Sequence, residues 1–418
     1  MRPFATTVPT YHFRAAVVLA ALAGGLALAG CDDDPPASLY DPAGQAGGKP
    51  VLSAILPAPS TNPADYALAG VTTLTLTGQN FSSTPANNAV YFDALEGEVL
   101  TASPTQLTVK PPAIVKDSIR VKVAVLRAPE FSETMLYRLY PASAEYARLD
   151  TNRKPQGIDV GPSGDLFVSN FNSAGLAVAR VVNDTLSSTL YSPVLASSAR
   201  FYNVIRFGPS GELYGFIRRD IVYRIPAGGG AAAVFAARGQ LGNMYDCDFD
   251  PSGTMWACGT IADTGTAAYR VRIGPPVDVK RLSLKGLMRS LRYYQNSLYF
   301  AGRRDTVEGV WRTPVVSADS IGAPVLVYNL TANYPGARAN AVTLTADGTI
   351  LLGTDAAPTI LKVSQAGVAE PLYPGLFSPG INTFTYGTGV YLFATREVPN
   401  SGGQSQVLRI NMQRPGAP

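Results

Sequence analysis

The sequence predicts an all-β protein in which a β-sandwich precedes a six-bladed β-propeller. Short runs of alternating polar and apolar residues, separated by Pro and Gly, fill residues 50–142, as in small sandwiches. From residue 143 onwards one turn motif recurs six times at intervals of about 45 residues, a period typical of propeller blades. The length of 418 residues also exceeds that of one ordinary domain.

Residues 1–30 have the pattern of a secretion signal. Arg2 and Arg14 supply a positive n-region, and an apolar stretch covers residues 15–29. That stretch is shorter than the roughly 20 residues that span a bilayer as a helix. It ends in Leu28-Ala29-Gly30-Cys31, which resembles the lipobox of bacterial lipoproteins. The resemblance implies cleavage before Cys31, lipidation of its thiol and a membrane as partner.

Residues 31–49 are expected to form a flexible tether, because Pro, Gly, Ala and Ser dominate them. Three aspartates follow Cys31 directly. A single Asp at this place resembles the inner-membrane retention mark of enteric bacteria, whereas an acidic cluster resembles the surface-export mark of Bacteroidota lipoproteins. The second interpretation fits the predicted domains better. We therefore expect a lipid-anchored protein of the cell envelope, in the outer membrane and facing the surface.

Residues 50–142 carry a more specific resemblance. Leu76-Thr77-Gly78-Gln79-Asn80-Phe81 is a strand that runs into a G-x-N-F turn, and Pro104-Thr105-Gln106-Leu107-Thr108-Val109 is a second strand with its preceding turn. These segments resemble the IPT/TIG family of immunoglobulin-like domains. The resemblance implies an immunoglobulin-like β-sandwich that acts as a spacer or an interaction module.

Residues 143–418 contain the six copies of the turn. In the clearest copies Pro presets the first turn torsion and Gly accepts a positive φ, so the turn is a tight hairpin. An apolar strand follows each turn, and a further strand carries Arg or Lys at a fixed place. Six such units favour a propeller that must close into a ring to bury its sheets. The turns are residues 161–164, 208–211, 250–253, 294–297, 345–348 and 386–389.

The last unit has only three strands before the chain ends. We therefore predict that Tyr146-Ala147-Arg148-Leu149 supplies the outer strand of the last blade and closes the ring. The repeats resemble NHL-type propellers. Trp256 and Trp311 fall in columns where other blades place aromatic residues, so we assign them to blade cores rather than to a sugar platform.

Composition excludes several functions. The single histidine, His12, lies in the predicted signal, so the mature protein has no Ser-His-Asp triad and no His-ligated zinc. The full sequence has 34 basic and 30 acidic residues, and without Arg2 and Arg14 the basic count falls to 32. That balance argues against a general nucleic-acid binder. We expect a monomer with no cofactor and no metal.

Charge alternates along the predicted inner strands of the propeller. The column consists of Asp159, Arg206, Asp248, Arg292 and Thr343. Opposite charges on neighbouring blades are expected to form ion pairs near the channel. The alternative is a polar channel that holds an ion or a small ligand.

Cys247 and Cys258 flank the turn at residues 250–253. A disulfide between them is allowed outside the cytoplasm. A four-residue loop would place the two cysteines opposite each other, whereas a three-residue loop with a bulge would put them on different faces. The sequence leaves both possibilities open.

The expected recognition face lies away from the repeated turns, where segments differ between blades. Arginines and aromatic residues there suit an anionic sugar or peptide, because guanidinium forks bind carboxylates and aromatic faces stack on sugar rings. The alternative is a scattered surface with unconnected salt bridges. The candidate ligand-binding residues are Phe171, Tyr202, Asn203, Arg218, Arg219, Tyr245, Asp246, Arg289, Arg303, Arg304 and Asn340.

Three functions fit these observations. The first is a non-catalytic binding module in which the propeller recognises a surface glycan or another extracellular ligand. The second is an enzyme resembling propeller lactonases or lyases, with a divalent metal held near Asp246, Asn203, Asn340 and Asn382. No Glu occupies the matching inner-strand position, which disfavours the enzyme. The third is a scaffold for an envelope protein complex.

Overall fold

The computed structural model describes most of the chain beyond the predicted signal and tether. Cys31 and Arg218 lie outside the described residues, as do the side chains of Lys154, Asn170 and Phe171. No helix among the described residues is long and apolar enough to cross a membrane. The described residues are 47–58, 66–147, 154–171, 175–197, 201–217, 219–236, 241–260, 265, 267–274, 276–397 and 405–417.

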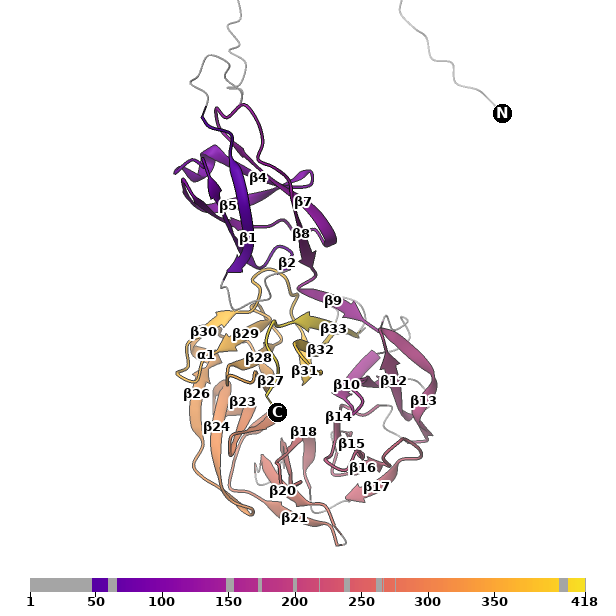
Figure 1. Cartoon of the computed structure of the whole chain (residues 1–418). Coiled ribbons are helices and arrows are strands. Elements are labelled where there is room, and N and C mark those ends of the chain that lie inside the picture. The colour runs from indigo at the N-terminus through magenta and orange to yellow at the C-terminus, as the bar shows by residue number, and fades with distance from the viewer. Residues whose placement is uncertain are drawn as a thin grey trace, which may run out of the picture.

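The N-terminal domain is an eight-stranded β structure that stands on one side of the ring in Figure 1. Its strands follow the order β1-β3-β6-β5-β4-β7-β8-β2, and β5 pairs with both β4 and β6. Alternate residues point into one core that includes Leu74, Val90, Leu107 and Val121. The elements are β1 (Val51–Ala58), β2 (Ala67–Leu68), β3 (Thr73–Gln79), the 3-10 helix η1 (Pro85–Asn87), β4 (Asn88–Phe92), β5 (Leu95–Ser103), β6 (Gln106–Lys110), β7 (Lys116–Val125) and β8 (Met135–Tyr140).

The rest of the chain forms six antiparallel sheets arranged in a ring (Figure 1). The strands of blades 1 to 3 are β10 (Lys154–Val160), β11 (Leu166–Phe171), β12 (Leu176–Val182), β13 (Thr185–Leu195), β14 (Val204–Phe207), β15 (Leu213–Phe216), β16 (Val222–Ile225), β17 (Ala233–Ala236), β18 (Asn243–Phe249), β19 (Met255–Thr260), β20 (Ala268–Arg272) and β21 (Asp278–Arg281).

Blades 4 and 5 and most of blade 6 follow in the same order, with one short helix after blade 4. Their elements are β22 (Leu287–Tyr294), β23 (Ser297–Arg304), β24 (Val307–Ser317), β25 (Ser320–Ile321), β26 (Val325–Asn329), α1 (Leu330–Asn333), β27 (Ala339–Leu344), β28 (Ile350–Thr354), β29 (Ile360–Val363), β30 (Ala369–Pro371), β31 (Ile381–Tyr386), β32 (Tyr391–Glu397) and β33 (Ser405–Asn411). The predicted six-bladed propeller is confirmed.

The repeated turns have the predicted geometry. Gly164, Gly211, Gly253, Gly348 and Gly389 have φ between 79° and 83°, a region that costs glycine little and other residues more. In the first copy the Gly164 N–H donates to the Gly161 carbonyl at 2.9 Å. Each turn joins the inner strand of its blade to the second strand, so the six copies mark one face of the ring.

The ring closes through a strand that comes from the start of the propeller. β9 (Ser143–Tyr146) pairs with β33 as the outer strand of blade 6. The predicted closure is confirmed, but the strand begins earlier than expected and ends at Tyr146. Ala147 has a φ of 69°, which ends the extended conformation, and Arg148 and Leu149 lie outside the described residues.

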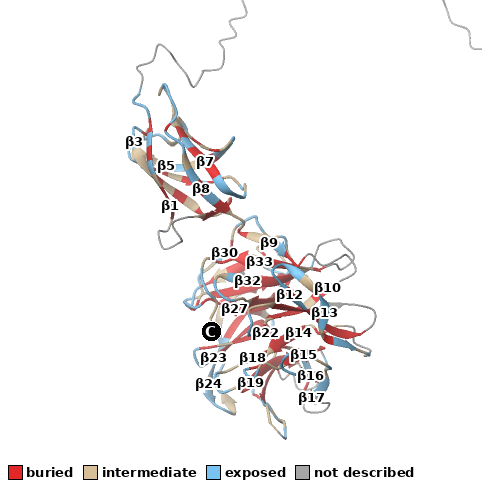
Figure 2. Ribbon diagram, turned by 45° about the vertical axis from the view of Figure 1, so that its right-hand side comes forward, coloured by how far each residue is buried: buried red, intermediate tan, exposed pale blue. Residues whose placement is uncertain are grey.

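Cores form between neighbouring blades rather than within them, so buried residues fill the inner part of the ring in Figure 2. Trp256 is fully buried between blades 3 and 4, and Trp311 is 7% exposed in the same cluster. Both tryptophans therefore belong to a blade core, as predicted.

The structure resolves the two possibilities for the cysteines. The Asp250 N–H donates to the Thr254 carbonyl at 3.1 Å, which leaves a three-residue loop. Cys247 then pairs with Ala257 and Cys258 with Asp246. The cysteines point to opposite faces of the blade, into two different cores, and both thiols are free and buried. Burial raises the pKa of each thiol well above its usual value.

Candidate binding site at the channel mouth

A buried carboxylate lies at the centre of the ring. Asp246, on β18, is 1% exposed. Its Oδ1 lies 3.2 Å from Nη2 of Arg206 and its Oδ2 lies 2.8 Å from Nη1 of Arg292. Ser290 Oγ donates to the same Oδ2 at 2.8 Å, and the backbone N–H of Cys247 donates to Oδ1 at 2.9 Å. The carboxylate is fully satisfied by the protein's own donors.

This network reaches every blade of the propeller. The Arg206 guanidinium also donates to the Ile158 carbonyl of blade 1 at 2.9 Å and to the Phe384 carbonyl of blade 6 at 3.2 Å. Blade 5 joins through the Val342 N–H, which donates to Ser290 Oγ at 3.1 Å. Of the expected ion pairs between blades, Asp159 with Arg206 is present at 3.6 Å. The prediction for Asp248 is wrong, because both arginines form their shorter ion pairs with Asp246 instead.

The environment shifts the acidity of these groups. Burial alone would raise the pKa of Asp246, but Arg206 and Arg292 outweigh burial and hold it below its usual value. Asp248 accepts the N–H groups of Phe249 and Tyr293 at 3.0 and 2.8 Å. Burial raises the pKa of Asp248, because the nearby arginines compensate it less completely. The pKa of Asp246 is thus shifted down, whereas that of Asp248 is shifted up.

The network divides the channel into two cavities. On the side of the repeated turns lies a cavity of 170 Å³ lined by Asp159, Asp248, Tyr386 and the arginines. The C-terminal segment covers this cavity, since the Ala417 N–H donates to the Leu344 carbonyl at 3.0 Å. On the other side lies a cavity of 50 Å³ at the channel mouth.

The mouth is a ring of polar side chains to which every blade contributes. They stand at or near the start of the inner strands, and together they are Gln156, Asn203, Tyr245, Asp246, Arg289, Asn340 and Asn382. A volume of 50 Å³ is far below the roughly 300–1,000 Å³ of a site that encloses a drug-sized ligand. The mouth therefore has room for only one small polar group.

Arg289 is held in place at this mouth. Its guanidinium forms a two-pronged ion pair with Glu308 on β24, at 2.7 and 3.0 Å. Glu308 in turn accepts the Ala339 N–H of the next blade at 3.1 Å. A guanidinium group that forms a bidentate ion pair with a carboxylate has a fixed orientation. It therefore loses little conformational entropy when a ligand binds.

The structure gathers five of the predicted ligand-binding residues at the mouth, namely Asn203, Tyr245, Asp246, Arg289 and Asn340. The prediction that Tyr202 binds a ligand is wrong, because its side chain is fully buried between blades 1 and 2 and packs against Tyr223. The prediction that Asp246 binds a ligand directly is also wrong, because its carboxylate oxygens are paired with Arg206 and Arg292.

Arg219, Arg303 and Arg304 do not line the mouth. Arg303 is exposed near the end of β23, and Arg304 lies over the Trp311 ring at 5.5 Å. Arg219 is exposed beside β16. Arg218 and the side chain of Phe171 lie outside the described residues.

The sequence did not predict Gln156 or Asn382 as ligand-binding residues. It also did not predict Glu308, which holds Arg289. The signal that would have found Gln156 and Asn382 is positional. Both stand near the start of an inner strand, at the place that Asn203, Arg289 and Asn340 occupy in other blades. Glu308 has no such signal, because its contact with Arg289 depends on the hairpin pairing of β22, β23 and β24.

The metal site of the enzyme hypothesis can be compared with the residues at the mouth. Among the described residues, no three His, Cys, Asp or Glu side chains come together. Asn203, Asn340 and Asn382 do meet Asp246 as the enzyme hypothesis requires. The carboxylate that would carry the charge of such a site is already neutralised by two guanidinium groups.

The fold and the site define a two-domain β protein whose closed propeller presents a polar mouth. Residues 50–135 match the family model of the IPT/TIG domain, so the N-terminal domain is an IPT/TIG domain. No curated protein matches the chain in sequence.

Solved structures show the same fold at low sequence identity. An auxiliary nutrient binding protein from Bacteroides thetaiotaomicron is 11% identical, with a TM-score of 0.52 over 89% of this chain and 98% of that chain. A luciferin-regenerating enzyme is 14% identical, with a TM-score of 0.51 over 66% of this chain and 96% of that chain. A virginiamycin B lyase from Staphylococcus aureus is 16% identical, with a TM-score of 0.44 over 63% and 86%. The first two structures, one named as a binding protein and one as an enzyme, are thus both similar to this fold, and function must be argued from the site.

Proposed function

We propose that the protein is a non-catalytic binding module of the cell envelope, whose propeller recognises a glycan at the channel mouth. The observation that carries the proposal is the state of Asp246, which accepts hydrogen bonds and ion pairs from two other strands and from its own. A carboxylate so engaged neither holds a metal nor serves as a general base.

The remaining groups at the mouth suit hydroxyl-bearing ligands. The amides of Asn203, Asn340 and Asn382 each offer both donors and acceptors, as sugar hydroxyls require. Arg289 is already paired with Glu308 and bonded to the Ala339 carbonyl, so it adds its remaining N–H donors rather than a free positive charge. The IPT/TIG domain, as an immunoglobulin-like sandwich, would act as the spacer that holds the propeller away from the membrane.

Replacing Asn203 or Asn382 with Ala is expected to weaken glycan binding by about tenfold each, because each loses hydrogen bonds that favour binding by about 1 kcal/mol or more. Neither side chain lies in a core, so both variants should fold. Asn333→Ala, on the exposed end of α1, is the matched control. The measurement is a carbohydrate array of the purified protein, followed by titration of the glycans that bind.

An array without signal, together with a protein that co-purifies, would support a scaffold instead. Calcium-dependent hydrolysis of a lactone that is lost on changing Asn203 and Asn382 would support the enzyme. Either result contradicts the proposal.

The membrane anchor is a second part of the proposal. Cys31→Ser is expected to move the protein from the membrane fraction to the soluble fraction, because the lipobox thiol carries the lipid. The measurement is sedimentation of membranes with antibody detection, and Cys258→Ser, at a buried thiol, is the matched control. A Cys31→Ser protein that still sediments with membranes would exclude lipid anchoring at this residue.

A further inference from the structure

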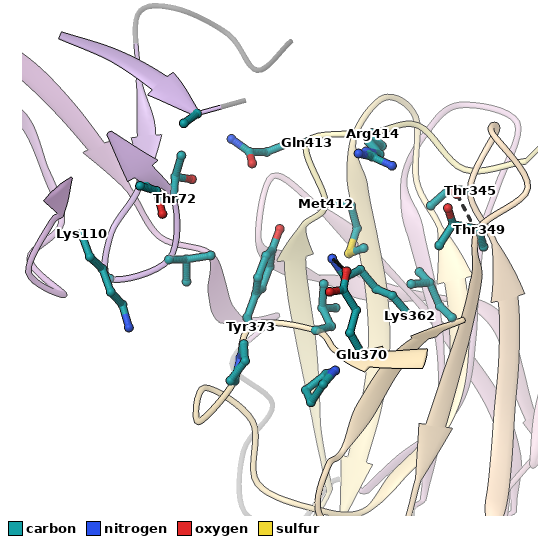
Figure 3. A pocket seen from close by; sticks show the side chains of 18 residues that line it. Thr72, Lys110, Thr345, Thr349, Lys362, Glu370, Tyr373, Met412, Gln413 and Arg414 are labelled. Atoms are coloured by element: carbon teal, nitrogen blue, oxygen red, sulfur yellow. Dashed lines mark hydrogen bonds and ion pairs between the residues drawn. The ribbon is translucent and has the colours of Figure 1, made fainter. Parts of the chain in front are cut away.

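A second and larger cavity lies between the two domains. Its volume is 430 Å³, within the range of about 300–1,000 Å³ typical of small-molecule sites. The IPT/TIG domain contributes the segment from Gly70 to Thr73 and Lys110, and the propeller contributes strands of blade 5 and the residues that follow β30 and β33. Figure 3 shows Lys110 on one side of this interdomain cleft and Lys362, Glu370 and Arg414 on the other. The cleft and the channel mouth share no lining residue.

The cleft has an excess of positive charge. Lys362 pairs with Glu370 at 2.6 Å, and Arg414 pairs with Asp347 at 2.7 Å. Lys110 is exposed and has no ion pair with any described residue. Three cations against two carboxylates leave one net positive charge at the cleft. A ligand with a single negative charge would balance it.

The propeller side of the cleft also holds an unused hydrogen-bond donor. Nε2 of Gln413 is buried and has no hydrogen-bond partner among the described residues, although its residue lines the cleft. A buried donor without an acceptor is costly, and few occur in native structures. Figure 3 shows the Gln413 side chain extending from the C-terminal segment towards the IPT/TIG domain. An acceptor on a bound ligand would satisfy it.

The backbone around the cleft is conformationally unusual. Gln413 has a φ of 55° and Tyr373 a φ of 47°, a region that residues other than glycine seldom adopt. Tyr373 is anchored there by its hydroxyl, which donates to the Asn411 carbonyl at 2.6 Å. Residues held in such conformations tend to occur at ligand sites, where the surrounding structure maintains them.

We propose that the interdomain cleft binds a sugar acid, a small hydroxylated ligand with one carboxylate. Lys110 and Arg414 take the carboxylate, and Gln413 with the part-exposed Thr73 and Thr349 takes the sugar hydroxyls. The Tyr373 ring, Pro371 and Pro374 supply apolar surface for the ring of the ligand. This site goes beyond the proposed function, because it lies apart from the channel mouth and draws on both domains.

The test is isothermal titration calorimetry of the purified protein with glucuronic acid and galacturonic acid, and with glucose and galactose as neutral counterparts. The acids are expected to bind with one site per chain and the neutral sugars at least about tenfold more weakly, since a charge-assisted hydrogen bond is lost. Lys110→Gln and Arg414→Gln should each weaken binding of the acids by about tenfold or more. Lys280→Gln, an exposed lysine on β21 of blade 3, should leave it unchanged.

Two results would overturn this proposal. One is a failure of both acids to bind, or equal binding of acidic and neutral sugars. The other is unchanged affinity in both cleft variants, with their folding verified by circular dichroism. Asn203→Ala and Asn382→Ala should not affect the binding of these acids, so failure at the cleft and failure at the mouth are distinguishable.

Discussion

Asp246→Asn is expected to destabilise the propeller by about 3–5 kcal/mol, because removing one partner of a buried ion pair leaves an uncompensated charge. Here the loss would affect two guanidinium groups at once, since Arg206 and Arg292 both pair with this carboxylate. Both arginines are nearly fully buried, with side chains 5% and 11% exposed. The measurement is urea denaturation followed by far-UV circular dichroism.

The matched control is Glu370→Gln, which breaks an ion pair whose side chains are 38% and 68% exposed. Exposed pairs contribute only about 0–1 kcal/mol, so this variant should unfold at nearly the same urea concentration as the parent. Equal stability of Asp246→Asn and the parent would show that the central network does not hold the ring together.

The same variant should change how stability depends on pH. The pKa of Asp246 is lower in the folded protein than in the unfolded chain, so its contribution is present above the ordinary carboxyl pKa and is lost as pH falls through the folded value. The raised pKa of Asp248 acts in the opposite direction, because its contribution is lost as pH rises through the raised value. Asp246→Asn should therefore lose less stability than the parent on acidification.

The propeller was predictable because its signals are local. Pro and Gly in the first three turns, and Gly alone in the last two, specify tight hairpins, and six copies of the repeat specify the number of blades. The closing strand was predictable for a different reason, since the last unit lacked a fourth strand. Its end was not, because the φ of Ala147 has no marker in the sequence.

The site was harder to predict because its side-chain directions depend on irregularities in the strands. The pairing of β18 with β19 shifts register between Met244 and Asp246, so simple alternation misplaces the residues that follow. Asp246 was recognised as polar and near the channel, but its partners lie on β14 and β22. Only the stacking of blades 2, 3 and 4 brings those strands together.

Tyr202 is a second residue whose surroundings depend on how the strands are placed. It stands next to Asn203, just before an inner strand, and it is an aromatic residue of a type common in binding sites. Its ring is nonetheless packed under Gly215, where an added Cβ would come within 2.4 Å of it. The pairing of an aromatic residue with a glycine on a neighbouring strand is the pattern of a core contact, and it is visible only when both strands are placed.

Trp256→Ala is expected to destabilise the protein by about 3–5 kcal/mol, the usual loss for a large aromatic residue removed from a core. Trp256 is fully buried in the cluster between blades 3 and 4. Its Nε1 also donates to Asp250 Oδ2 at 2.9 Å, which fixes the turn that follows β18. Urea denaturation followed by far-UV circular dichroism measures the loss without relying on tryptophan fluorescence.

Phenylalanine substitutions separate packing from hydrogen bonding. Trp256→Phe keeps most of the packing but loses a hydrogen bond to a charged group, worth about 1.5–3 kcal/mol. Trp311→Phe loses no such bond, because the Trp311 Nε1 has no partner, and it should remain close to the parent in stability. If both tryptophans belong to blade cores, neither substitution should alter glycan binding in a folded protein. A selective loss of binding in either variant, at unchanged stability, would instead make that tryptophan a ligand platform.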